Sequence, residues 1–142
     1  MSAVRLVRSD GLAAAPHAYA SRVEAGAELI FLAGACPLAH DGSTVAVGDV
    51  AGQAQRCVET MLVALDAAGA ALADVASTRV LVASSDRRDL VAAWDVVRAA
   101  FGDHDVPSTL IGVAALGYPD QLVEIEAVAA VRGGLPAPDR RL

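Results

Sequence analysis

The clearest alternation of apolar and polar positions lies in the last third of the chain. Apolar and β-branched runs bounded by Pro and Gly predict strands at residues 108–115 and 121–131, joined by a Gly-Tyr-Pro-Asp turn. Side chains alternate between the two faces of a strand. In the second strand, Glu124 and Glu126 therefore share one face, while the apolar residues on either side of them share the other.

The same reading predicts the other elements. Apolar positions spaced three and four residues apart indicate two helices. The first has Asp49 as its N-cap and ends at Gly69, and the second begins at Ser85 or Asp86 and ends at Gly102. Short apolar runs predict the remaining strands, at residues 3–7, 19–23, 28–34 and 78–83. This order predicts an α+β domain with two helices on one face of a mixed six-stranded sheet.

Composition indicates what covers the other face of that sheet. Apolar residues make up 55% of the chain, but alanine supplies much of that fraction and aromatic residues only 4%. A chain with so few large side chains builds a thin core, so we expect copies of the chain to associate through the uncovered face. Residues 1–142 are long enough for one domain, and we expect a flexible tail from about residue 133.

Charge and segment composition disfavour two classes of partner. The formal net charge is −6 and the isoelectric point about 4.8, whereas nucleic-acid binding needs a basic surface. No run is long enough to cross a bilayer, and the N-terminal segment does not resemble a signal peptide. We therefore expect a cytoplasmic protein that binds neither nucleic acid nor membrane. Cys36 and Cys57 form neither a disulfide framework nor a CxxC motif.

No motif for a cofactor or a metal is present. The chain lacks GxGxxG, P-loop, HExxH and GxSxG sequences, and its three histidines are scattered, so we expect neither cofactor nor metal. Ser108 with His104 four residues upstream could form a nucleophile and its base. No orienting acid or oxyanion motif accompanies the pair, which favours a structural serine.

Four other residues have both a structural and a functional interpretation. Glu124 lies in an apolar run, so it either faces water or lines a pocket that repays its desolvation. Cys36 follows a strand without a neighbouring cation, which favours a packing or pocket-lining thiol over a nucleophile. Trp94 has the helical spacing of a core residue, and Tyr118, on a turn, is either exposed or a pocket lid.

Several motifs follow one another in a familiar order: Tyr19, IFLAGACPL at 30–38, the segment 48–75, GVAAL at 112–116 and VEIEA at 123–127. Together they resemble the Rid/YjgF family of small trimeric enamine/imine deaminases, over about residues 19–131. The resemblance implies a chorismate-mutase-like subunit. It also implies a homotrimer whose sheets pack around a central core, with three pockets for a small-molecule metabolite at the subunit interfaces.

The resemblance also implies roles for particular residues. Glu124 matches the glutamate that activates the hydrolytic water, Tyr19 matches the pocket tyrosine, and Gly34 matches the glycine of a substrate-facing turn. We expect Glu124, Tyr19, Gly34 and Ser108 to lie around one cleft. The full set of expected substrate-binding residues is Gly34, Ala35, Cys36, Trp94, Ser108, Thr109 and Tyr118.

The chain departs from the family at its defining arginine. That arginine stands in a Pro-Ala-Arg-Ser motif and grips the substrate carboxylate with a bidentate pair. Ser108 takes its place here and carries no charge. Ala33 and Trp94 stand where the family has serine and asparagine, which makes the expected pocket more apolar. Arg22 lies three positions after Tyr19, on the opposite strand face, and is a poor substitute.

The sequence therefore predicts a Rid-family homotrimer outside the arginine-bearing branch. If it is an enzyme, it hydrolyses or tautomerises an imine or enamine other than a simple imino acid, with Glu124 as general base and Tyr19 as orienting donor. Two alternatives stay open at this point. One is a non-catalytic trimer that binds a ligand or another protein, and the other is a biosynthetic tailoring enzyme, a cyclase or lyase.

Overall fold

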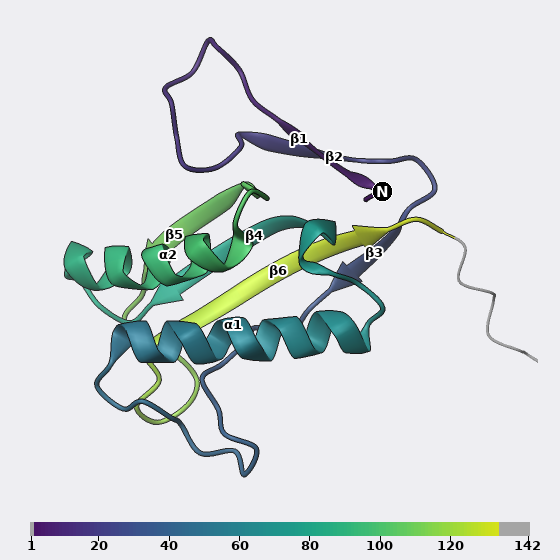
Figure 1. The fold of residues 1–142 in the computed structure, drawn as a ribbon. Helices are drawn as coiled ribbons and strands as arrows, with labels where there is room; N and C mark the ends of the chain where they lie inside the picture. The colour runs from purple at the N-terminus through teal and green to yellow at the C-terminus, as the bar shows by residue number, and fades with distance from the viewer. Residues whose placement is uncertain (1, 134–142) are drawn as a thin grey trace, which may run out of the picture.

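The computed structural model describes residues 2–133, which form two helices and two β-sheets (Figure 1). The strands are β1 (Val4–Val7), β2 (Ala20–Val23), β3 (Glu28–Phe31), β4 (Val75–Val82), β5 (Ser108–Gly112) and β6 (Val123–Val131). The helices are α1 (Val50–Ala67), α2 (Arg87–Phe101) and a short 3₁₀ turn, η1 (Leu72–Asp74). The α+β class expected from the sequence is confirmed, and most differences in element bounds are of a few residues.

The prediction of a single six-stranded sheet is wrong. The strands form a four-stranded sheet, in the order β3-β6-β4-β5, and a separate β1-β2 hairpin (Figure 1). In the larger sheet only β4 and β5 are parallel, so the sheet is mixed. After the hairpin, the chain turns at Gly26, which has a positive φ of 81°. Hydrogen bonds connect the hairpin region to β4 and to the loop after α2. Ser21 Oγ donates to Ala76 O at 2.6 Å, and Ala18 N donates to Asp105 O at 2.7 Å.

Both long helices have aspartate N-caps: Asp49, as predicted, and Asp86, one of the two residues predicted for the second helix. The Asp49 carboxylate accepts a hydrogen bond from Gly52 N at 3.0 Å, and the Asp86 carboxylate accepts one from Arg88 N at 2.9 Å. Each bond satisfies a backbone donor that has no partner inside the helix. At the other end of α2, Gly102 adopts a φ of 57°, which ends the helix without a side-chain clash.

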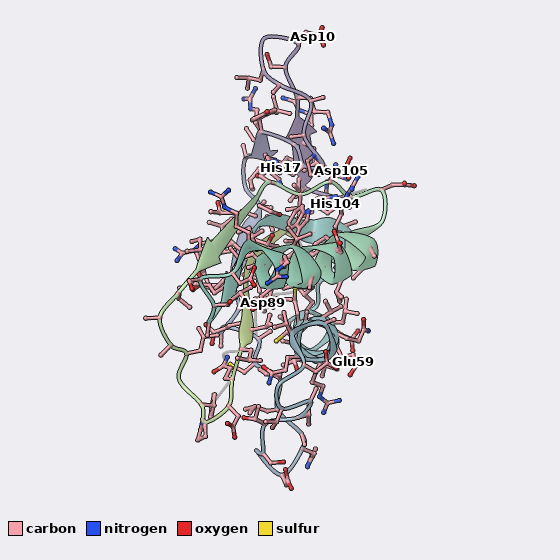
Figure 2. All side chains as sticks on the ribbon, turned by 90° about the vertical axis from the view of Figure 1, so that its left-hand side faces the viewer. Asp10, His17, Glu59, Asp89, His104 and Asp105 are labelled. Carbon is pink, nitrogen blue, oxygen red and sulfur yellow. The ribbon has the colours of Figure 1, made fainter. Side chains whose placement is uncertain are left out.

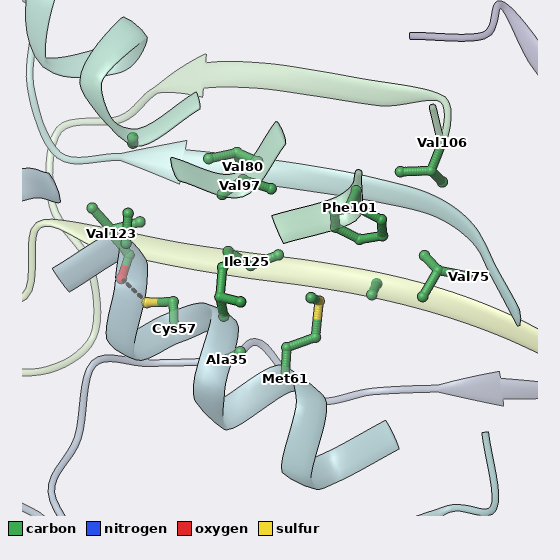
Figure 3. Close-up of a cluster of buried hydrophobic side chains, with 14 of the residues drawn as sticks. Ala35, Cys57, Met61, Val75, Val80, Val97, Phe101, Val106, Val123 and Ile125 are labelled. Atoms are coloured by element: carbon green, nitrogen blue, oxygen red, sulfur yellow. Dashed lines mark hydrogen bonds between the residues drawn. The ribbon is translucent and has the colours of Figure 1, made fainter. Parts of the chain in front are cut away.

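The core lies between the two helices and one face of the four-stranded sheet (Figure 3). On β6, Val123 and Ile125 point into this core and are at most 1% exposed. Met61 of α1 and Phe101 of α2 pack into the same cluster. The helices thus bury every second residue of β6, and the residues between them are directed to the other face of the sheet.

That other face carries exposed apolar side chains. Ile30 of β3 is the register partner of buried Ala129 and packs on the core, so its neighbours Leu29 and Phe31 point the other way. Leu29 is 52% exposed and Phe31 is 73% exposed. Large apolar side chains at adjacent same-face positions are unusual on the surface of an isolated subunit.

Candidate functional site

Glu124 lies on the uncovered face of β6, where two neutral groups donate to one of its oxygens. Cys36 Sγ donates to Glu124 Oε1 at 3.1 Å, and Gln121 Nε2 donates to the same oxygen at 3.3 Å. The segment that carries Cys36 runs beside β6, because Ala35 N donates to Ile125 O at 2.7 Å and Ile125 N donates back at 3.1 Å. The carboxylate is half-buried, and both of its hydrogen bonds among residues 2–133 end on Oε1.

Gly34 gives the carboxylate the space that it occupies. A Cβ atom at this position would stand 2.6 Å from Glu124 Cδ and 2.6 Å from Glu124 Oε2. Contacts this short are not tolerated between carbon and a neighbouring side chain, so a residue other than glycine would push the carboxylate away. The glycine expected in a substrate-facing turn thus lies directly against the expected catalytic base.

Cys36 is a hydrogen-bond donor in this arrangement. Burial, followed by the hydrogen bond to Glu124 and the charge of that carboxylate, raises the pKa of the Cys36 thiol to about 11. The Gly34 carbonyl oxygen lies 3.4 Å from the same sulfur and is the more distant acceptor. A thiol with this pKa stays protonated near neutral pH, and only the thiolate is a nucleophile.

Two buried glutamines hold the loop that precedes Glu124, and the sequence analysis missed both. Gln121 is 4% exposed; its Oε1 accepts from Tyr118 N at 3.1 Å, and its Nε2 also donates to Val123 O at 3.1 Å. Gln53 of α1 is fully buried; its Oε1 accepts from Leu122 N at 2.7 Å. For Gln53, the sequence signal was a polar residue next to the buried stripe of the first predicted helix.

Tyr19, Trp94 and Ser108 form a second group, on the side of the molecule where the hairpin meets α2. The Tyr19 hydroxyl donates to Ala13 O at 2.5 Å, and its ring contacts the edge of His17 at a centroid distance of 5.7 Å. His17 in turn contacts Trp94, at 6.4 Å. Figure 2 shows His17, with His104 and Asp105, between the hairpin and α2.

Trp94 and Ser108 line a small cavity beneath α2. Its free volume is about 10 Å³, room for about one water. Ser108 Oγ donates to Val106 O at 3.0 Å and lies 2.6 Å from Thr78 Oγ1. Ser108 is therefore bonded within its own chain, and Trp94 occupies part of the space beside it. Arg98 and Asp105 line the same cavity, so it carries one charge of each sign from these two residues.

The remaining predicted residues lie outside both groups. Ala35 is 3% exposed, so its side chain belongs to the core and only its backbone borders the Glu124 segment. Thr109 is exposed on β5, opposite Arg79 of β4. The Tyr118 ring is exposed, although its backbone bonds to Gln121.

The expected cleft is thus divided within a single chain. Of the residues expected beside Glu124, the structure brings Gly34 into contact and places Tyr19 and Ser108 in the other group. No hydrogen bond within residues 2–133 joins the two groups directly. A meeting of the two groups across copies of the chain stays a prediction.

The described part of the chain has neither a metal-binding cluster nor a helix suited to a membrane. Residues 2–133 contain no group of three or more histidine, cysteine or acidic side chains placed to hold a metal ion. None of the helices over the same range combines the length and the apolar character that a membrane span requires.

The family model described as endoribonuclease L-PSP matches residues 11–131, which is most of the chain. The chain belongs to this family. The resemblance to Rid/YjgF proteins is therefore confirmed at the level of the family. A RutC family protein of Pyrococcus abyssi is 31% identical over 111 residues, covering 78% of this chain and 84% of that protein. The 3-aminoacrylate deaminase RutC of Acinetobacter baylyi is 30% identical over 117 residues, covering 82% and 88%.

Solved structures agree with this assignment. The Rid-family protein YyfB of Yersinia pestis has a TM-score of 0.84 at 26% identity, over 91% of this chain and 99% of its own. A YjgF/YER057c/UK114 family member of Mycobacterium tuberculosis is 32% identical, with a TM-score of 0.61 over 90% and 99%. The Rid-family protein thus has the fold of these structures along nearly all of their length.

The raised pKa of Cys36 leads to a test of the contact with Glu124. We expect the rate of iodoacetamide labelling at Cys36 to rise still at pH 10, where an ordinary cysteine has levelled off. Glu124→Gln removes the charge and the carboxylate acceptor, so the thiol should label several-fold faster at pH 8. Glu126→Gln, two residues along the strand, is the matched control and should change nothing. Mass spectrometry separates Cys36 from the fully buried Cys57. A labelling rate that levels off near pH 9 in the unmodified protein would contradict the described contact.

Proposed function

We propose that this Rid-family protein hydrolyses an imine, or an enamine after tautomerisation, with Glu124 as the general base. The observation that carries the proposal is the half-buried Glu124 carboxylate, held through Oε1 by Cys36 and Gln121. Its other oxygen, Oε2, lies against Gly34 and has no protein hydrogen bond among the described residues. A base held through one oxygen and open at the other is suited to take a proton from water.

The proposed reaction needs one base and no cofactor. Water adds through its oxygen to the carbon of a protonated C=N bond, and Glu124 takes the proton that the water loses. Glu124 then returns this proton to the nitrogen. As the C–N bond breaks, Glu124 takes the hydroxyl proton and passes it to the departing ammonia, so that a carbonyl compound and ammonium leave. For an enamine, a proton is first added at the β-carbon, which gives the same protonated imine.

Association of several copies would complete the pocket. The Glu124 group and the Tyr19 group are separate in one chain, and the exposed Leu29 and Phe31 offer an apolar surface on the same sheet face as Glu124. A homotrimer with its sheets packed inward would bury that surface. We propose that it also brings the Tyr19 group of one subunit toward Glu124 of the next.

We propose a substrate without a carboxylate at the position that the family's arginine would recognise. Ser108 is uncharged and bonded within its chain, and Arg98, which lines the same cavity, is exposed on the surface of α2. This distinguishes the expected substrate from 3-aminoacrylate, the substrate named for the relative from Acinetobacter baylyi. The net charge of −6 also favours a metabolite over the RNA that the family's description suggests.

Trimer formation is tested by mass. Light scattering of the unmodified protein at micromolar concentration should give about three times the 14.4 kDa of one chain. Phe31→Glu places a charge on the face that is proposed to pack inward, so it should lower the mass toward one subunit. Val63→Glu, at a 71% exposed position on α1, is the matched control and should keep the trimer. A mass of one subunit for the unmodified protein would contradict the proposal.

Catalysis is tested with imines released in situ by amine and amino-acid oxidases, with semicarbazide as the competing trap. The protein should speed hydrolysis of an uncharged imine, such as that from benzylamine. Glu124→Gln should reduce the rate about a hundredfold or more, because the base is lost. Glu126→Gln has the same change two residues away and should retain most of the activity. Equal rates in the Glu124→Gln variant and the unmodified protein would exclude Glu124 as the base.

Substrate choice is tested by restoring the missing charge. The cavity beside Ser108 is too small for an arginine side chain, so Ser108→Arg needs Trp94→Asn to make room. The double variant should gain at least about tenfold on 2-iminopropionate, as a charge-assisted pair with its carboxylate would supply. Trp94→Asn alone is the control and should gain nothing, and thermal melts check folding. If the unmodified protein already hydrolyses 2-iminopropionate at ordinary enzymatic rates, the proposed substrate class is wrong.

A further inference from the structure

A second polar concavity lies far from Glu124 in the same chain. It is a groove of about 360 Å³ where the β1-β2 hairpin approaches the end of β6, and Arg5, Arg22, Glu24 and Arg132 line it. Figure 1 shows the start of β1 beside the end of β6. Arg132 follows Glu124 by eight residues, so the two lie about 26 Å apart along an extended strand. Within one chain, the groove is therefore separate from the Glu124 group.

Two of these arginines face each other directly. Arg5 of β1 and Arg22 of β2 are register partners in the antiparallel hairpin, and both are exposed. Directly opposite residues of such a pair share one face, with Cβ atoms about 5 Å apart. Like charges in this position destabilise the pairing of the two strands. An anion bound between them would therefore stabilise the hairpin.

The acidic side chains of the described residues do not supply that anion. Within residues 2–133, five arginines form ion pairs with a carboxylate, namely Arg8, Arg56, Arg79, Arg88 and Arg132. Arg5 and Arg22 are not among them, although the chain as a whole is acidic. Arg132 pairs with Glu24 at 2.8 Å. Three guanidinium groups and one carboxylate thus leave the groove with two positive charges.

We propose that this groove binds a small ligand through a dianionic phosphate group. The two uncompensated charges match a phosphate dianion, whereas a single carboxylate would balance only one of them. Guanidinium groups present paired N–H donors that fit two oxygens of one phosphate. The volume lies in the range of small-molecule sites. An extended nucleic acid would need a longer basic track, and the overall charge of −6 opposes it.

Calorimetric titration with inorganic phosphate at low ionic strength tests the proposal. The unmodified protein should bind one phosphate per chain with a saturable heat. The double variant Arg5→Ser with Arg22→Ser should bind at least about tenfold more weakly, because both uncompensated guanidinium groups are gone. Arg87→Ser is the matched control, since Arg87 is also exposed and makes no ion pair among the described residues; its affinity should stay within about twofold.

Thermal melts separate a loss of phosphate binding from a change in folding of the double variant. Without phosphate, the variant should melt no lower than the unmodified protein, because a repulsive pair has been removed. Phosphate should raise the melting temperature of the unmodified protein and of Arg87→Ser but not that of the double variant. Acetate at the same ionic strength should have less effect. An equal shift in all three proteins, or no saturable heat, would overturn the proposal.

Two further outcomes would assign the groove to another partner. A short single-stranded RNA that binds a hundredfold more tightly than phosphate, and only when Arg5 and Arg22 are present, would replace the small ligand by a nucleic acid. A change in the light-scattering mass of the double variant would make the groove a contact between copies of this chain. Either result would overturn the proposal, and neither depends on imine hydrolysis.

Discussion

The packing of one face of β6 under both helices is the constraint on which the candidate site depends. Because side chains alternate along a strand, burying Val123 and Ile125 fixes the direction of Glu124. Packing in the core therefore determines the direction of the Glu124 carboxylate, although this carboxylate lies on the opposite face of the sheet. The segment that carries Gly34 and Cys36 bonds to the same strand, so the base and its partners share one rigid support.

The hydrogen-bond donors to Glu124, Cys36 and Gln121, leave its negative charge uncompensated. A thiol and an amide are neutral, and Glu124 makes no ion pair within residues 2–133. An arginine in the same place would hold the carboxylate equally well but would neutralise its field. A negative charge left uncompensated suits a cationic reaction partner, such as a protonated imine, and opposes an anionic one.

The sequence predicted what local patterns determine and missed what distant contacts determine. The helix caps at Asp49 and Asp86 and the alternation around Glu124 depend on neighbouring residues, and the predictions agree with the structure. The separation of the hairpin from the main sheet does not depend on neighbouring residues. Alternation of apolar and polar residues predicts strands but does not determine which strand edges pair. Gln53 was missed for a similar reason: its partner Leu122 lies 69 residues away. Local patterns do not indicate which residues meet Glu124 across copies of the chain; for Tyr19 and Ser108 that expectation came from the family resemblance.

Because Gly34 approaches Glu124 so closely, the residue at position 34 determines where the carboxylate of position 124 can lie. While the glutamate is present, every residue with a Cβ at position 34 meets its carboxylate at 2.6 Å. A shorter side chain at position 124 would remove that obstacle. With the glutamate in place, replacement of Gly34 would instead displace the carboxylate from its bonds to Cys36 and Gln121. A residue larger than glycine at position 34 would thus misplace the base without any change at position 124.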